Sequence, residues 1–230
     1  LILKKFIKVN LIQQKFDKMK IKYQNLRVLG PAILKVKIPE EIIIKLNEYV
    51  DKIAEDKSKL KKLNYGEGLV GDVTQEFLLE LEFVKSSGWL NFLGNCSKIY
   101  ADLNEGKKIT KFNLLKTWVV RQFKNEYNPT HWHSGHISGA GFLKVPKTLG
   151  KHYQEEKTGF KNYAGGTLNL IHGSKQFLSK ATFQIKPEVG DFYFFPNYMM
   201  HTVYPFKGTD EERRSISFNA YVDQSIYDTF

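Results

Sequence analysis

The chain has 230 residues and a formal net charge of +11, and 42% of its residues are hydrophobic and 14% aromatic. This length and apolar content suit one substantial domain or two small ones, and they exclude a wholly disordered chain. The single cysteine, Cys96, excludes an internal disulfide and fits a reducing compartment, so we expect a cytoplasmic protein. The sequence has no run of about 18 apolar residues, so we expect no membrane-spanning segment.

Much of the positive charge lies at the N-terminus. Residues 1–22 contain seven lysines and one aspartate, a balance of +6, which leaves +5 of the +11 for the other 208 residues. Such a segment can bind nucleic acid or a membrane surface, but an extension without a role is the simpler interpretation. Because Met19 could be the natural start, residues 1–18 could be translated upstream sequence, and we expect residues 19–230 to form one domain.

The first hundred residues begin with one predicted strand, because apolar and basic residues alternate at the end of residues 27–37. The signals after this strand are mainly helical. Pro39 and the two acidic residues after it predict a helix start, and apolar residues at helical spacing continue to about residue 57. A second helix is predicted over residues 89–103, with Cys96 in the core, whereas residues 73–85 fit either a helix or an extended segment. We therefore expect a helical support layer over residues 39–104.

From residue 109 the sequence is typical of β-structure, with about eight short strands separated by Gly and Pro turns as far as residue 222. This pattern predicts a jelly roll, or cupin-like double-stranded β-helix, and the whole chain is then α+β, mainly β, with an N-terminal helical support layer. The predicted strands cover residues 112–123, 137–145, 165–171, 181–185, 191–195, 201–204 and 213–222.

Three of the six histidines lie within six residues, at His131, His133 and His136, and no acidic residue occurs between Glu126 and Glu155. Histidine is a common metal ligand, and residues i and i+2 share one face of a strand, so His131 and His133 can bind one ion. A single histidine here would suggest only a polar loop. The pair followed by a third favours a metal site.

His201 is the candidate third ligand, because it begins a short predicted strand 68 residues beyond His133 that could lie beside the histidine pair in a two-sheet jelly roll. Three protein ligands leave open coordination positions, which catalysis requires and a purely structural site lacks.

The last predicted strand begins with two adjacent arginines. Alternation along this strand gives it a polar face, which is costly in a barrel interior unless a ligand occupies it. Arg213 offers a planar set of donors that suits a carboxylate, and Ser215 can add a hydroxyl; a β-bulge would let Arg214 take the place of Arg213. The polar face comprises Arg213, Ser215, Ser217 and Asn219, and the opposite face comprises Arg214, Ile216 and Phe218.

Four motifs in this order resemble those of the Fe(II)/2-oxoglutarate-dependent oxygenases, and in particular the branch whose metal motif is His-x-His. The resemblance covers roughly residues 112–222. The motifs are His131-x-His133 with Ser-Gly after it, Pro187-x-x-Gly-Asp-Phe-x-x-Phe-Pro196, the later His201, and Arg213-x-Ser-x-Ser-Phe-Asn219.

The resemblance implies that His131, His133 and His201 hold Fe(II), and that 2-oxoglutarate chelates the iron through its keto acid end. The far carboxylate of 2-oxoglutarate would lie on Arg213 and Ser215, and O2 would be the second co-substrate. Decarboxylation to succinate and CO2 would accompany hydroxylation of an unidentified substrate. Gly190 and Asp191 would have a structural role in the turn before the strand that leads to His201.

One departure from the common pattern concerns His133, because most sites of this type use two histidines and one carboxylate. A neutral third ligand would leave the iron more positive. His136 could instead replace His131 or His133. A halogenase-like arrangement, in which small residues after His133 leave room for chloride, is a further alternative.

Two other classes of function fit part of the pattern. Three histidines also suit a zinc enzyme or a cupin-type isomerase or thiol dioxygenase, although such enzymes do not need Arg213 and Ser215. The second class is a non-catalytic jelly-roll binding protein. Substrate contacts are expected from the loops at 64–72 and 147–163, and the possible wall residues Trp132, Tyr163 and Tyr193 are as easily explained as core.

Overall fold

The computed structural model describes residues 9–10, 22–26, 30–66, 71–149, 165–176 and 180–228. Residues 1–8 and 11–21, residues 67–70 of the predicted loop at 64–72, most of the predicted loop at 147–163, and Tyr163 with it lie outside this part of the chain. None of the described helices is long and apolar enough to cross a membrane. The helices are α1 (Glu40–Glu55), α2 (Lys57–Leu63), α3 (Leu81–Ser86), α4 (Trp89–Glu105) and α6 (Gln224–Tyr227).

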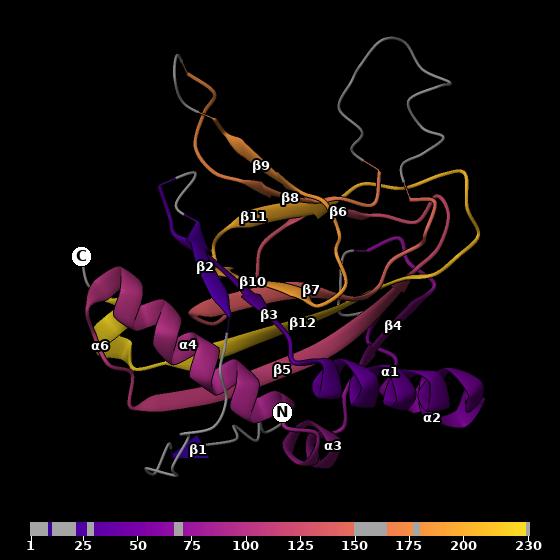
Figure 1. Cartoon of the computed structure of the whole chain (residues 1–230), viewed down its shortest axis with the longest axis horizontal. Coiled ribbons are helices and arrows are strands. Elements are labelled where there is room, and N and C mark those ends of the chain that lie inside the picture. The colour runs from indigo at the N-terminus through magenta and orange to yellow at the C-terminus, as the bar shows by residue number, and fades with distance from the viewer. Residues whose placement is uncertain are drawn as a thin grey trace, which may run out of the picture.

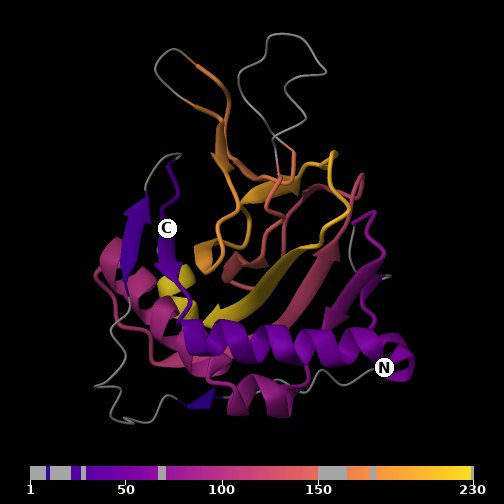
Figure 2. The ribbon, with the colours of Figure 1, turned by 45° about the vertical axis from the view of Figure 1, so that its right-hand side comes forward.

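The strands form two antiparallel sheets that face each other without closing into a barrel, which confirms the predicted jelly roll (Figures 1 and 2). The larger sheet has the order β1-β5-β12-β7-β10-β3-β2, with β4 also paired to β5, and the smaller has the order β6-β11-β8-β9. The strands of the larger sheet are β1 (Val9–Asn10), β2 (Tyr23–Leu26), β3 (Ile33–Lys37), β4 (Gln75–Leu78), β5 (Lys111–Gln122), β7 (Ile137–Lys144), β10 (Asp191–Pro196) and β12 (Arg213–Val222). Those of the smaller sheet are β6 (Asn128–His131), β8 (Leu168–Ile171), β9 (Thr182–Ile185) and β11 (Met200–Val203).

The helical layer packs on the outer face of the larger sheet, as predicted. Helix α1 begins after Pro39, has Glu40 and Glu41 in its first turn, and buries one apolar stripe. Helix α4 runs between two glycines with left-handed backbone, Gly88 and Gly106. Both helices share a core cluster with the outward side chains of the sheet, and the predicted core residue Cys96 is fully buried within it. Burial also raises the pKa of the Cys96 thiol far above its usual range.

The prediction of a strand and two helices was too simple for the first hundred residues. The ambiguous segment at 73–85 contains both β4 and α3, and the basic run that begins at Lys57 is the short helix α2. The Asp56 side chain accepts hydrogen bonds from the backbone N–H groups of Ser58 and Lys59, which is a helix N-cap. None of the residues of α2 is fully buried, but Leu60 and Leu63, which are three residues apart, pack against the core cluster.

Two glycines in β7 let aromatic rings approach the backbone of the sheet. A Cβ atom at Gly139 would lie 2.6 Å from the rings of Phe192 and Phe218, and one at Gly141 would lie 2.6 Å from the carbonyl oxygen of Asp191 and overlap the Phe192 ring. Phe192 and Phe218 pack with each other at 5.9 Å between ring centroids. Because glycine has no side chain, Gly139 and Gly141 leave room for the Phe192 and Phe218 rings between the sheet and the helical layer.

We expect Gly141→Ala to lower the free energy of unfolding by about 3 kcal/mol, because overpacking of a buried site forces ring and backbone shifts. Gly66→Ala is the control, since a Cβ there would meet only the Asn64 side chain at 3.4 Å. Urea unfolding of the two variants measures the difference, and equal stabilities would contradict this account of β7.

Candidate metal centre

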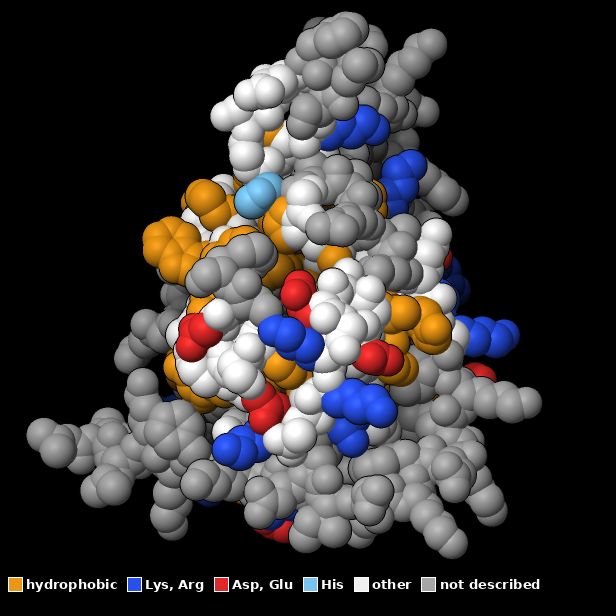
Figure 3. Space-filling model, turned by 90° about the vertical axis from the view of Figure 1, so that its left-hand side faces the viewer, with side chains coloured by type: hydrophobic (Ala, Val, Ile, Leu, Met, Phe, Trp, Pro, Cys, Tyr) orange, Lys and Arg blue, Asp and Glu red, His pale blue; other side chains and the backbone are white. Residues whose placement is uncertain are grey.

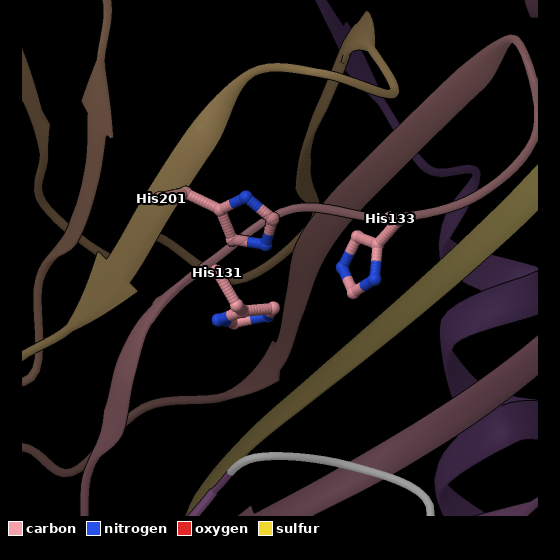
Figure 4. A group of neighbouring side chains, drawn as sticks. All are labelled: His131, His133 and His201. Atoms are coloured by element: carbon pink, nitrogen blue, oxygen red, sulfur yellow. The ribbon is translucent and has the colours of Figure 1, made fainter.

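His131, His133 and His201 form one cluster between the two sheets (Figure 4). His131 ends β6 and pairs directly with His201 on β11. The ring centroids of these two histidines are 4.2 Å apart, and His133 lies 4.9 Å from each of them. One ring nitrogen from each histidine lies within 4.8 Å of the others. The structure thus brings together the three histidines that the sequence proposed as ligands.

His133 reaches this cluster by a different route from the one expected. It lies two residues beyond the end of β6, so the two histidines do not share one regular strand. Its backbone N–H donates to the carbonyl oxygen of Asn197 at 3.1 Å, and the Asn197 side-chain amide donates to the His133 carbonyl oxygen at 3.1 Å. The turn after β10 therefore positions His133.

Two of the rings have a fixed orientation. His131 Nδ1 lies 2.7 Å from the carbonyl oxygen of Pro129, and His201 Nδ1 lies 2.9 Å from that of Met199. A carbonyl oxygen only accepts, so each Nδ1 carries the proton, and each Nε2 keeps a lone pair for a ligand bond. The His133 ring stands edge-on to Trp118, with 5.3 Å between ring centroids.

The cluster strongly favours neutral imidazoles. Desolvation, with a smaller contribution from the neighbouring imidazoles, lowers the pKa of His133 to about 2 and that of His201 to about 3. Desolvation also lowers the pKa of His131, with a contribution from the charge of Lys116. Three neutral nitrogen donors in a buried group fit a divalent transition-metal ion, because metal ligation requires deprotonated imidazole.

Arg213 lies in the same cavity as the histidines and is only 1% exposed. Its Nε donates to the carbonyl oxygen of Gly166 at 2.8 Å, one terminal nitrogen donates to Ser215 Oγ at 3.4 Å, and its guanidinium lies 5.1 Å from the centre of the Phe142 ring. Burial lowers its pKa to about 9, so the group remains a cation at neutral pH. No carboxylate in the described part of the chain forms an ion pair with it.

Arg214 points to the other face of β12 and is fully paired. It donates to Glu212 at 2.7 Å and to Asp51 of α1 at 2.5 Å. The predicted alternation is therefore present, because Arg213, Ser215 and Ser217 all line the cavity. The other lining residues are Trp118, Val120, Asn128, His131, His133, Ala140, Phe142, Leu168, His201 and Val203, and none of them is acidic.

His136 is not part of the cluster. Its ring stacks on Tyr227 of α6 at 4.2 Å, and its Nδ1 accepts from the backbone N–H of Val222. Of the possible wall residues, Trp132 is 65% exposed, and Tyr193 is buried in a core cluster to which both sheets contribute. The sequence reasoning missed Trp118, Val120 and Asn128, although the alternation of β5 and the position of Asn128 before the histidine pair could have indicated them.

A larger cavity, of about 550 Å³, lies away from the histidine cluster, and none of the three histidines lines it. Its walls come from α4, α6 and the segment before β3, and they include Tyr100, His136, Tyr198 and Tyr227. Figure 3 shows this side of the molecule, where hydrophobic side chains and charges of both signs are interspersed.

Comparison with known proteins gives a family for the part of the chain that contains the site. Residues 116–219 match the family model described as "Putative 2OG-Fe(II) oxygenase". This part of the chain is a 2OG-Fe(II) oxygenase domain. The match contains the three clustered histidines, Arg213 and Ser215. No curated protein matches the chain in sequence.

Two solved structures share the fold of this chain. A prolyl-4-hydroxylase from Pseudomonas putida superposes with a TM-score of 0.53 at 12% identity, over 83% of this chain and 93% of that one. A prolyl hydroxylase from Trichoplax adhaerens, in complex with a hypoxia inducible factor peptide fragment, gives a TM-score of 0.50 at 12% identity, over 85% of each chain. The family that residues 116–219 match implies Fe(II), 2-oxoglutarate and O2.

Proposed function

We propose that this chain is an Fe(II)- and 2-oxoglutarate-dependent dioxygenase that hydroxylates a C–H bond of a still unidentified substrate and releases succinate and CO2. His131, His133 and His201 would hold the iron, and Arg213 and Ser215 would hold the far carboxylate of 2-oxoglutarate. The observation that carries the proposal is that one cavity contains three neutral imidazoles and a buried arginine without an acidic partner among the described residues.

The histidine cluster is suited to bind a metal without a change of protonation. Because the pKa values of His133 and His201 lie near 2 and 3, no proton has to leave these rings at neutral pH. Hydrogen bonds to the carbonyl oxygens of Pro129 and Met199 orient the His131 and His201 rings before the ion arrives. Bound Fe(II) supplies the centre for O2 activation and for oxidative decarboxylation of the co-substrate.

Arg213 is suited to position the co-substrate. A buried cation without a counter-ion is costly, and a carboxylate that enters the cavity would relieve that cost. The remaining donors of the guanidinium and the Ser215 hydroxyl can both point to the same carboxylate. One end of a five-carbon diacid would then lie on Arg213, and its keto acid end would lie toward the histidines on the same cavity wall.

No acid lines the cavity among the described residues, which distinguishes this site from the two-histidine, one-carboxylate type. With three neutral protein ligands, bound Fe(II) keeps its full charge of +2 until an anion binds. This excess charge favours 2-oxoglutarate, whose keto acid end is anionic. The same histidines would also suit a zinc enzyme, but such an enzyme has no need of an unpaired Arg213 at the far end of the cavity.

Anaerobic titration of the Fe(II)-loaded protein with 2-oxoglutarate tests the proposal. We expect a visible metal-to-ligand charge-transfer band to appear with one 2-oxoglutarate per iron, because the keto acid end chelates the metal. Succinate should also bind but give no band, since it lacks the keto group. Failure of the band to appear with iron demonstrably bound would exclude a 2-oxoglutarate oxygenase and favour the zinc-type alternative.

A further inference from the structure

Glu76 is a buried acid that lies directly behind the lining of the cavity. It belongs to β4, at the edge of the larger sheet (Figure 1), and pairs with Val120 of β5. Directly paired residues of an antiparallel sheet share one face, and Val120 lines the cavity, so Glu76 is on the inner face. The next residue across the sheet is Ser215, the paired neighbour of Val120. Glu76 is 2% exposed.

The carboxyl group of Glu76 is incompletely satisfied. Its Oε2 atom is buried and has no hydrogen-bond partner in the described part of the chain. The chain at Gly71 closes over the group, because a Cβ atom there would lie 2.9 Å from Glu76 Oε1 and would overlap Asn128 Oδ1. Asn128 is itself a lining residue of the cavity. The acid thus lies against two cavity residues, one from each sheet.

The charges around Glu76 do not compensate for ionisation. The neighbouring acid Glu126 adds a negative charge near Glu76. The Glu126 carboxylate accepts hydrogen bonds from the backbone N–H groups of Thr74 and Phe123, which favour its ionised form. Val120 and Asn128, the contacts of Glu76 on β5 and β6, are uncharged, and Arg213 on β12 forms no ion pair with Glu76. Burial, reinforced by the charge of Glu126, raises the pKa of Glu76 to about 7, although its hydrogen bond with Asn128 lowers it.

We propose that Glu76 is protonated in the complex with 2-oxoglutarate, so that binding of this dianion takes up one proton and Glu76 sets the upper pH limit of co-substrate affinity. The inference rests on the proposed function, because it takes Arg213 and Ser215 as the site of the far carboxylate. An ionised Glu76 would place a second negative charge two strands from Ser215, across Val120, in a buried region of low dielectric, whereas the neutral acid would not repel the carboxylate. Glu76 is therefore a specificity-determining residue and does not touch the reacting atoms.

Isothermal titration calorimetry of the anaerobic, Mn(II)-loaded protein with 2-oxoglutarate tests this proposal. For the wild type we expect about tenfold weaker binding at about pH 8 than at about pH 6, because affinity falls as Glu76 ionises around its pKa. Repeating the titration near pH 7.5 in two buffers of different ionisation enthalpy should show uptake of about three quarters of a proton, the fraction of Glu76 that is ionised at that pH when its pKa is about 7. The diacid does not titrate in this range, since carboxylic acids ordinarily lose their proton near pH 4.

Glu76→Gln keeps the shape of the side chain but cannot ionise, so it should bind with little pH dependence and no proton uptake. Its melting temperature should also exceed that of the wild type near pH 8. The reason is that an acid whose pKa is raised on folding costs stability once the pH exceeds the ordinary value. Glu82→Gln is the matched control, because Glu82 pairs with Lys85 on the surface and should keep the wild-type pH profile.

The outcomes separate the two proposals. Binding of 2-oxoglutarate without proton uptake, or uptake that persists in Glu76→Gln, would overturn the role of Glu76 and leave the proposed function intact. No binding of 2-oxoglutarate to the metal-loaded wild type at any pH would overturn both. Uptake that is lost in Glu76→Gln and kept in Glu82→Gln supports the inference.

Discussion

His201→Ala should abolish iron binding, reducing the metal content after anaerobic reconstitution from about one Fe(II) per chain to less than about a tenth of that. His201 provides the only proposed ligand on β11, and the other two come from the segment that begins with β6. Two neutral imidazoles without a third donor hold Fe(II) weakly at micromolar concentration. Elemental analysis of the desalted protein measures this loss directly and needs no substrate.

The matched control is His136→Ala. His136 lies in the same short segment as His131 and His133, but its ring stacks on Tyr227 outside the cluster. This variant should retain the full metal content and should lose only some stability. Normal iron content in His201→Ala, or loss of iron from His136→Ala alone, would require a different ligand set.

Much of the fold could be predicted because its signals are local. The apolar stripe of α1, the alternation on β12 and the Gly and Pro turns between strands each depend on residues close together in the chain. The location of His201 beside His131 also followed from a jelly-roll pattern with short strands. These predictions agree with the structure because the local preference of each segment and its tertiary packing favour the same arrangement.

The features that could not be predicted depend on contacts between distant residues. His133 is positioned by Asn197, which is 64 residues away in the chain, so the idea that it lies on a regular strand with His131 was wrong. The burial of Glu76 arises from the pairing of β4 with β5 and from the chain at Gly71. Nothing in the sequence around residue 76 distinguishes this acid from an exposed one. The sequence assigned Arg213 to the cavity face and kept Arg214 as the alternative if a bulge shifted the register, and the structure places Arg213 on the cavity lining.

The two adjacent arginines of β12 allow the function of the site to be separated from the stability of the fold. Arg213 faces the cavity and has no acidic partner in the described residues, whereas Arg214 is ion-paired with Glu212 and Asp51. We expect Arg213→Ala to weaken 2-oxoglutarate binding at least about 100-fold, equivalent to about 3 kcal/mol, because it removes the charged donors for the far carboxylate. Its metal content should stay normal, since none of the three histidines depends on Arg213.

Arg214→Ala should give the opposite result. It leaves Glu212 and Asp51 without this partner and should lower the free energy of unfolding by about 2–4 kcal/mol, while 2-oxoglutarate affinity stays within about threefold of wild type. Arg213→Ala should cost less stability, because it removes a buried cation that has no counter-ion in the described part of the chain. Calorimetry with 2-oxoglutarate and urea unfolding on both variants measure the contrast. If Arg214→Ala lost co-substrate binding while Arg213→Ala kept it, the carboxylate would have to lie on the other face of β12, and the proposed site would be wrong.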